Sequence, residues 1–424
     1  MAAYLDHAAT TPLRPEAAAA MLPWLTDRFG NPSGSHAVAR AARAAIDDAR
    51  DIAAAALGVA PGGVIFTGGG TEADNLAIAG VLARRPGAVV CSAIEHHAVL
   101  HAAAAATVAA ATAAAATAAA ATAAEAEAAE PAAATAAEAA AATAAEAAPK
   151  DRATDCRIVP VHPDGTVDLD RLADALDPTV SVVSIMLANN EVGTIQPFAR
   201  LARLVRRHAP QAVLHTDAVQ AFAWLDVAQV AQPADLISVS AHKFGGPQGT
   251  GVLAVRGDVA LAPLIHGGGQ ERDRRSGTHN VAGIVGLAAA MHATIEARAA
   301  TVARLARLRD RLADRLLHAI PGSVETGDRA LKIAGNCHLC FDGIESEALL
   351  VLLDDAGVYA SAGSACTSGA MEPSHVLVAM GIDRQRALGS LRLSLGHTTT
   401  DEDVDLALKV IPDAVARLRQ PGRT

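Results

Sequence analysis

Short runs of β-branched and other apolar residues alternate along this chain with stretches that have the apolar periodicity of helices. Five of these runs lead directly into polar clusters, and they occupy residues 63–66, 88–93, 180–187, 212–215 and 236–239. This alternation predicts βα units around a largely parallel sheet, and therefore an α/β fold. Because ligands bind beyond the carboxyl ends of parallel strands, we expect the five clusters to converge on one crevice.

The pattern changes after about residue 298, where an Arg-rich helix is expected over residues 301–320 and short strands and helices follow it. A chain of 424 residues is also longer than a typical single domain. We expect a large domain over residues 12–298 and a smaller α+β domain formed by residues 1–11 and 299–424.

An Ala-rich segment of low complexity, at about residues 104–152, interrupts the large domain. Residues 102–124 carry no charge and are numerous enough to span a bilayer, but they are almost entirely Ala and Thr. These residues favour membrane insertion far less than Leu, Ile or Phe, so no membrane span is expected. We interpret the segment as a partly helical surface insertion without chemistry of its own.

Composition narrows the possible partners. The chain is 51% apolar and carries a formal net charge of −10, which disfavours a nucleic acid or an anionic membrane as partner. Its five cysteines are too scattered for a disulfide framework, so a reducing, cytoplasmic location is expected. Small molecules and proteins are the expected partners.

Two local patterns carry candidate chemistry. Residues 66–72, FTGGGTE, form a Gly-rich turn that opens a helix, where free N–H groups and the helix dipole favour a phosphate. Only four of the 35 basic residues are lysines, and Lys243 directly follows a strand. A buried lysine has a lowered pKa and forms an imine with a carbonyl. Asp217, at the end of the strand that holds His215, is placed to pair with a ring nitrogen, and the three features together indicate pyridoxal phosphate.

The assembled motifs resemble those of the IscS/NifS-like cysteine desulfurases, which are fold-type-I pyridoxal-phosphate enzymes of the class-V aminotransferase family. In chain order the motifs are YLDHAATTP, FGNPSGSH, GGTEADNLAI, EHHAVL, NNEVGTIQP, HTDAVQ, SAHKFGGPQGTG, HGGGQERDRRSGT, SAGSACTSG and SLRLSLGHTTT. The resemblance covers nearly all of the chain except the insertion. It implies a large domain with a mostly parallel seven-stranded sheet and a smaller α+β domain that carries a catalytic cysteine loop.

Carried over by position, the resemblance implies how pyridoxal 5′-phosphate is bound. Gly70 and Thr71 hold the phosphate, with Ser240 and His242 assisting from the turn before the lysine. Thr278 matches a threonine that reaches the phosphate of the neighbouring subunit. The resemblance therefore implies a homodimer.

The remaining positions imply contacts to the cofactor ring. Asn190 and Gln220 match residues that bond the ring hydroxyl oxygen, and Asp217 matches the partner of the pyridinium nitrogen. His96 matches the histidine that stacks on the ring and takes part in proton transfer. His97 lies one residue off the motif and is given no role.

The resemblance also implies the reaction, in which L-cysteine becomes L-alanine. Arg392 clamps the substrate carboxylate, Lys243 forms the imine, and the Cys366 thiolate takes the sulfur as a persulfide. Cys366 lies in a run of small residues that predicts a mobile loop, which suits transfer to a sulfur-acceptor protein. The sulfur is expected to supply iron–sulfur cluster assembly or tRNA thiolation.

Other patterns in the sequence allow alternative interpretations. Cys337 and Cys340 resemble a C-x-x-C pair, but residues three apart in a strand face opposite sides, so no metal site is expected. The HGGG and S-x-x-K patterns lack the companion motifs of esterases and penicillin-binding enzymes. A selenocysteine lyase, another fold-type-I enzyme and a non-catalytic sulfur-trafficking adaptor stay open.

We predict that replacing residues 104–152 with a short Gly/Ser linker preserves cofactor binding and turnover within a few-fold. Loop-closure entropy grows only logarithmically, so a surface insertion of this length costs on the order of 1–2 kcal/mol. Several differently spaced deletions should be assayed for cofactor content, dimerisation and activity. Loss of activity in all of them, with cofactor and dimer retained, would show that the insertion is functional.

Overall fold

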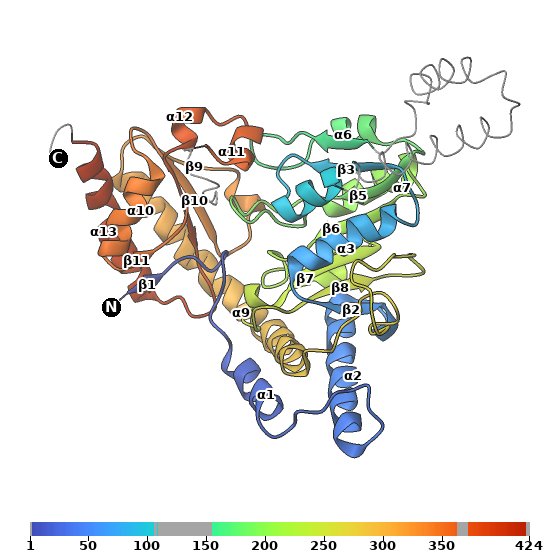
Figure 1. Cartoon of the computed structure of the whole chain (residues 1–424). Coiled ribbons are helices and arrows are strands. Elements are labelled where there is room, and N and C mark those ends of the chain that lie inside the picture. The colour runs from blue at the N-terminus through green and yellow to red at the C-terminus, as the bar shows by residue number, and fades with distance from the viewer. Residues whose placement is uncertain (1, 106–107, 109–154, 363–371, 421–424) are drawn as a thin grey trace, which may run out of the picture.

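The computed structural model describes residues 2–105, 108, 155–362 and 372–420 (Figure 1). Most of the Ala-rich insertion and the whole segment around Cys366 lie outside these residues. The predictions made for the insertion and for the cysteine loop are therefore not addressed by the structure.

A seven-stranded sheet forms the centre of the large part of the molecule, in the order β2-β8-β7-β6-β5-β3-β4. Only β8 runs antiparallel, to β2 on one side and β7 on the other, which confirms the expected mostly parallel sheet. The strands are β2 (Val64–Thr67), β3 (Ala88–Ser92), β4 (Cys156–Val159), β5 (Val180–Ser184), β6 (Val213–Asp217), β7 (Leu236–Ser240) and β8 (Gly251–Val255).

Both faces of this sheet are covered, which explains why its inner strands are continuous apolar runs. On one face, Val89 and Val182 pack with Leu76 of α3 (Gly70–Leu82). On the other face, Val90 and Val183 belong to the largest apolar core. The helices with residues in that core are α1 (Pro15–Leu25), α2 (Ala37–Leu57), α6 (Leu169–Ala175), α7 (Phe198–His208), α8 (Val227–Val230) and α9 (Val281–Ala319).

A smaller antiparallel sheet, β12-β10-β9, lies on the opposite side of the molecule with the N-terminal segment beside it (Figure 1). A parallel pair of short strands, β1 and β11, accompanies it, and Leu5 packs in the core of this part. Its elements are β1 (Ala3–Tyr4), β9 (Ser323–Glu325), β10 (Asn336–Phe341), α10 (Ser346–Asp355), β11 (Val358–Tyr359), α11 (His375–Ala379), α12 (Arg384–Ala387), β12 (Ser390–Ser394) and α13 (Asp401–Leu418).

The helix expected over residues 301–320 is the second half of a longer one, so its predicted start is wrong. Helix α9 has 39 residues and begins at Val281, where Asn280 caps it by accepting from the N–H of Gly283. Its first three turns are rich in Ala and Gly and mostly buried, with Ile284 and Leu287 in the large core, so no amphipathic stripe marks them. Because α9 runs across residue 298, the proposed domain boundary stays a prediction.

The strand β10 confirms that the C-x-x-C cysteines do not face each other. Cys337 packs in the core of the small sheet, whereas Cys340 packs with Met186 and Val376 on the other face. None of the helices that the structure describes is both long enough and apolar enough to cross a bilayer.

Candidate active site

The carboxyl ends of the central strands bring the expected residues to one edge of the sheet. Lys243 ends a single 3-10 turn (Ala241–Lys243) that directly follows β7, and its side chain is half-buried. Its Nζ donates to the carbonyl oxygens of Ala8 and Ala9, at 2.6 and 2.8 Å. Burial and the charge of Arg392 lower the pKa of Lys243 to about 8, although the nearby carboxylates of Asp217 and Asp6 act in the opposite direction. The amine is therefore partly uncharged near neutral pH.

Asp217 is the last residue of β6 and is only 5% exposed. Its Oδ1 accepts a hydrogen bond from the backbone N–H of Val219 at 2.8 Å. Burial raises the pKa of Asp217 to about 6, while that hydrogen bond and the charge of Lys243 limit the rise. A cationic ring nitrogen at this carboxylate would favour its ionised form further.

The Gly-rich turn at the start of α3 has the geometry of an anion site. Gly69 has a φ of 151°, which side chains disfavour, and no side chain caps the first turn of the helix. A Cβ at Gly70 would lie 2.8 Å from Val219 Cγ2 and 3.3 Å from Ser240 Cβ, so the backbone approaches the Ser240 side chain closely. Open N–H groups at Gly70 and Thr71 beside a serine hydroxyl fit a phosphate.

Two histidines flank the lysine. His96 follows β3 and has an exposed surface, yet desolvation by the surrounding protein, the charge of Lys243 and the nearby histidines lower its pKa to about 4. Burial and Lys243 also lower the pKa of His242 to about 4, and its Nδ1 lies 3.1 Å from Thr10 Oγ1. Both rings are therefore neutral near pH 7, and a neutral ring is suited to stacking and to accepting a proton.

Arg392 lies on β12 of the small sheet, and its side chain reaches residues of the large part of the molecule. Its Nη2 donates to Asp6 Oδ1 at 2.8 Å, and its Nη1 donates to the carbonyl oxygen of Asn190 at 3.2 Å. The guanidinium is buried and contributes to the lowered pKa of Lys243, so the two cations are close enough to interact. Gln220 belongs to the same group, because its Nε2 donates to the Ala8 carbonyl that also holds the lysine.

Thr278 is exposed, on a loop that is held firmly to the rest of the chain. Glu271 in this loop pairs with Arg50 at 2.7 Å and accepts from the N–H of Phe66, and Arg275 pairs with Glu72 at 2.8 Å. The loop therefore has a fixed position beside the phosphate turn while Thr278 stays open to another molecule. Cys366 lies outside the described residues, so its position relative to this site is not given.

Sequence reasoning missed the part played by the N-terminal segment. Asp6 contacts Arg392, and Ala8 and Ala9 contact Lys243. The sequence contains these residues in the YLDHAATTP motif, but it predicted no individual role for them. Backbone carbonyls leave no signal in the residue type, and an acidic residue next to the apolar Leu5 is the only local sign of Asp6. The donor set as a whole fits pyridoxal phosphate: an anion cradle, an amine of low pKa and a buried carboxylate.

The chain is similar to known proteins over nearly its whole length. The family described as Aminotransferase class-V matches residues 3–113 and 107–407. A protein of Mycobacterium tuberculosis named IscS-like cysteine desulfurase is 42% identical over 427 residues, covering 99% of this chain and 97% of that protein. Cysteine desulfurase IscS of Methanosarcina thermophila is 40% identical over 421 residues, covering 99% of this chain and 93% of that protein. A solved NifS-like protein superposes with a TM-score of 0.81 at 31% identity, covering 98% of this chain and 100% of that one.

We predict that the covalent capture of pyridoxal 5′-phosphate by the apoprotein rises with pH through about 8, because the uncharged Lys243 amine is the reacting form. Arg392→Gln should move this midpoint upward, since it removes a cation that lowers the pKa of Lys243. Asp217→Asn should move it downward, since it removes an anion that raises that pKa. Borohydride trapping at a series of pH values measures the midpoint.

Lys243→Ala is the control, and it should show no trapped cofactor at any pH. Trapping that persists in this variant, or a midpoint that moves in the same direction for both neighbours, would contradict the assignment.

Proposed function

This chain belongs to the class-V aminotransferase family, and within that family we propose that it is a pyridoxal-phosphate-dependent cysteine desulfurase. One observation carries the proposal: an amine of lowered pKa, at Lys243, interacts electrostatically with both a buried carboxylate, Asp217, and a buried guanidinium, Arg392. The Asp217 carboxylate suits a cationic ring nitrogen, and the Arg392 guanidinium suits the carboxylate of an amino acid. The named relatives support cysteine as that amino acid.

Each residue of the site has a defined task under this proposal. When bound, pyridoxal phosphate withdraws electrons from the substrate Cα and so weakens its bonds. Gly70, Thr71, Ser240 and His242 would hold the phosphate group, and Asp217 would keep a proton on the ring nitrogen. Asn190 and Gln220 would bind the ring hydroxyl oxygen, and His96 would contact the ring.

Lys243 binds the cofactor and then moves a proton at the substrate Cα or Cβ, which its pKa near 8 allows in both directions. Arg392 holds the substrate carboxylate through its terminal nitrogens. To bind the substrate, Arg392 Nη2 must break its ion pair with Asp6. The Asp6 side chain is 22% exposed and can turn toward water.

Cys366 receives the sulfur. Its thiolate attacks the sulfur of the bound substrate, an S–S bond forms, and the C–S bond of the substrate breaks. A proton takes the place of sulfur at the substrate Cβ, so L-cysteine and the Cys366 thiol give L-alanine and a Cys366 persulfide. The outer sulfur then passes to a sulfur-acceptor protein in the cytoplasm, for iron–sulfur cluster assembly or tRNA thiolation.

We place the active enzyme in a homodimer, because Thr278 is exposed on a loop fixed beside the phosphate turn. An exposed threonine on a rigid loop is available to a second copy of the chain. Under this arrangement, Thr278 of each subunit bonds the phosphate bound by its partner.

We predict that Cys366→Ser retains the visible absorbance of the cofactor and its change on adding L-cysteine, but forms no persulfide and no sulfide above background. A hydroxyl is a far weaker nucleophile toward sulfur than a thiolate, whereas substrate binding does not need the thiol. Absorbance spectra and a sulfide assay of the purified holoenzyme measure the two properties separately.

Cys337→Ser is the matched control, because Cys337 is buried in the small core, and it should keep full activity. Labelled sulfur that appears on Cys337 or Cys340 in the Cys366→Ser variant would contradict the proposal. A wild-type protein that binds the cofactor but releases no L-alanine from L-cysteine would refute the function itself.

A further inference from the structure

Three buried polar atoms on one face of the small sheet have no hydrogen-bond partner within the part of the chain that the structure describes. They are Asn336 Oδ1, His338 Nε2 and Arg392 Nε. His338 and Arg392 lie directly opposite each other on the antiparallel strands β10 and β12. Asn336 precedes His338 by two residues on the same strand, so its side chain is on the same face. Buried polar groups rarely stay unpaired, so each of these three atoms needs a hydrogen-bond partner that the described part of the chain does not supply.

Thr326 contacts the other ring nitrogen of His338, and we assign the proton to that nitrogen. His338 Nδ1 lies 3.0 Å from Thr326 Oγ1, and the same hydroxyl lies 3.6 Å from Cys340 Sγ. With Nδ1–H donating to the hydroxyl, and the hydroxyl donating to the sulfur, all three groups are satisfied. Nε2 is then the unprotonated nitrogen and accepts a hydrogen bond.

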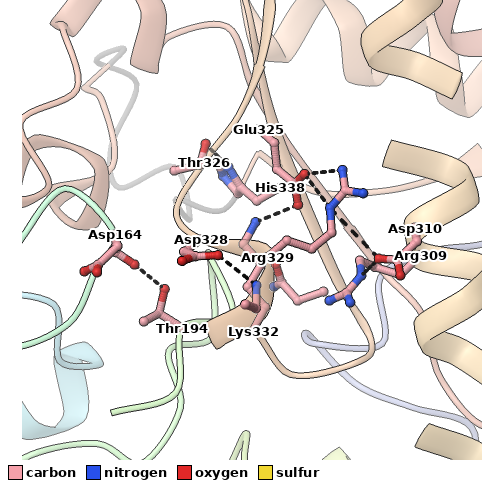
Figure 2. Close-up of polar contacts among 12 residues, drawn as sticks. Asp164, Thr194, Arg309, Asp310, Glu325, Thr326, Asp328, Arg329, Lys332 and His338 are labelled. Atoms are coloured by element: carbon pink, nitrogen blue, oxygen red, sulfur yellow. Dashed lines mark hydrogen bonds and ion pairs between the residues drawn. The ribbon is translucent and has the colours of Figure 1, made fainter. Parts of the chain in front are cut away.

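The surroundings keep His338 neutral. The residue is fully buried, and burial together with the charges of Lys332 and Arg392 lowers its pKa to about 3. Lys332 has no exposed side-chain surface and pairs with Glu325 at 3.1 Å, and Glu325 also accepts from Arg329 at 2.9 Å. Figure 2 shows this charged cluster on one side of His338 and the Thr326 hydroxyl at its ring.

The other two atoms have complementary chemistry. Asn336 Nδ2 donates to the carbonyl oxygen of Glu191 at 2.8 Å, which leaves Oδ1 as an acceptor. Arg392 Nη1 donates to the carbonyl of the preceding residue, Asn190, so the two side chains end at adjacent peptide groups. Arg392 Nε is a donor. A water molecule has the matching groups, since it accepts one hydrogen bond, as from Arg392 Nε, and donates two, as to His338 Nε2 and Asn336 Oδ1.

We propose that His338 is a positioning residue for Arg392, and that one buried water, held also by Asn336, joins His338 Nε2 to Arg392 Nε. A hydrogen bond at Nε restrains rotation of the guanidinium plane, so that Nη1 and Nη2 stay directed toward the substrate site. A bidentate carboxylate contact depends on that plane. The proposal rests on the proposed function, in which Arg392 binds the carboxylate of L-cysteine.

The test compares three variants of the holoenzyme. His338→Leu removes the acceptor and should raise the KM for L-cysteine about tenfold, with kcat changed by less than about threefold. His338→Gln places an amide oxygen near the position of Nε2 and should restore most of the lost affinity. Leu339→Ala is the matched control, because Leu339 is buried on the opposite face of the same strand. It should lower the melting temperature without changing KM.

Two further measurements separate this proposal from the proposed function. In the Cys366→Ser background, the dissociation constant of L-cysteine, followed by the visible absorbance of the cofactor, should also rise about tenfold with His338→Leu. A high-resolution crystal structure of the holoenzyme should show the water between Arg392 and His338. Wild-type enzyme without turnover would refute the function, whereas the water and the dissociation constants test His338 independently.

The proposal is overturned by any of three results. One is a His338→Leu variant that loses thermal stability but keeps its KM and its dissociation constant. Another is a rise in KM that Leu339→Ala reproduces, since that rise would report general loosening of the small sheet. The third is a crystal structure with no water at the shared position.

Discussion

The charge balance around the half-buried Lys243 amine is the constraint on which the rest of the site depends. Within hydrogen-bond distance the amine has the two neutral carbonyls of Ala8 and Ala9, while its charged neighbours lie further out. Arg392 destabilises the ammonium form, and Asp217 and Asp6 stabilise it. Since desolvation and Arg392 outweigh the two carboxylates, the amine loses its proton readily enough to act as a nucleophile.

This balance needs both parts of the chain at once. Asp217 ends strand β6 and Lys243 ends the turn after β7, both in the large sheet, whereas Arg392 comes from β12 of the small one. Backbone hydrogen bonds join the parts, from Ile195 N to the Leu331 carbonyl at 2.7 Å and from Ile333 N to the Gly193 carbonyl at 3.0 Å. Both bonds fix the loop that carries Asn190, whose carbonyl accepts from Arg392. The Arg392 guanidinium therefore keeps its position relative to Lys243 and Asp217.

The sequence was most informative where a functional residue directly follows a strand. Lys243, Asp217 and the Gly-rich turn at Gly70 could be found because the strand before each is apolar and the turn after it is not. Asp6 and the partners of Lys243 could not, because they act through long-range contacts and backbone carbonyls. The start of α9 was missed for a different reason: its first three turns are mostly buried and made of Ala, Gly and other apolar residues, so no alternation of apolar and polar positions marks them as a helix.

The other buried lysine of the described chain shows why position alone does not make an amine reactive. Lys332 is more deeply buried than Lys243, and burial lowers its pKa as well. It donates, however, to the Glu325 carboxylate at 3.1 Å, so losing its proton would leave that buried anion with one partner fewer. Lys243 donates to neutral carbonyls, so its deprotonation leaves no carboxylate without a hydrogen-bond donor. The same residue type is therefore a fixed cation beside His338 and, under the proposed function, the nucleophile beside Asp217, and the difference lies in whether an anion is in direct contact.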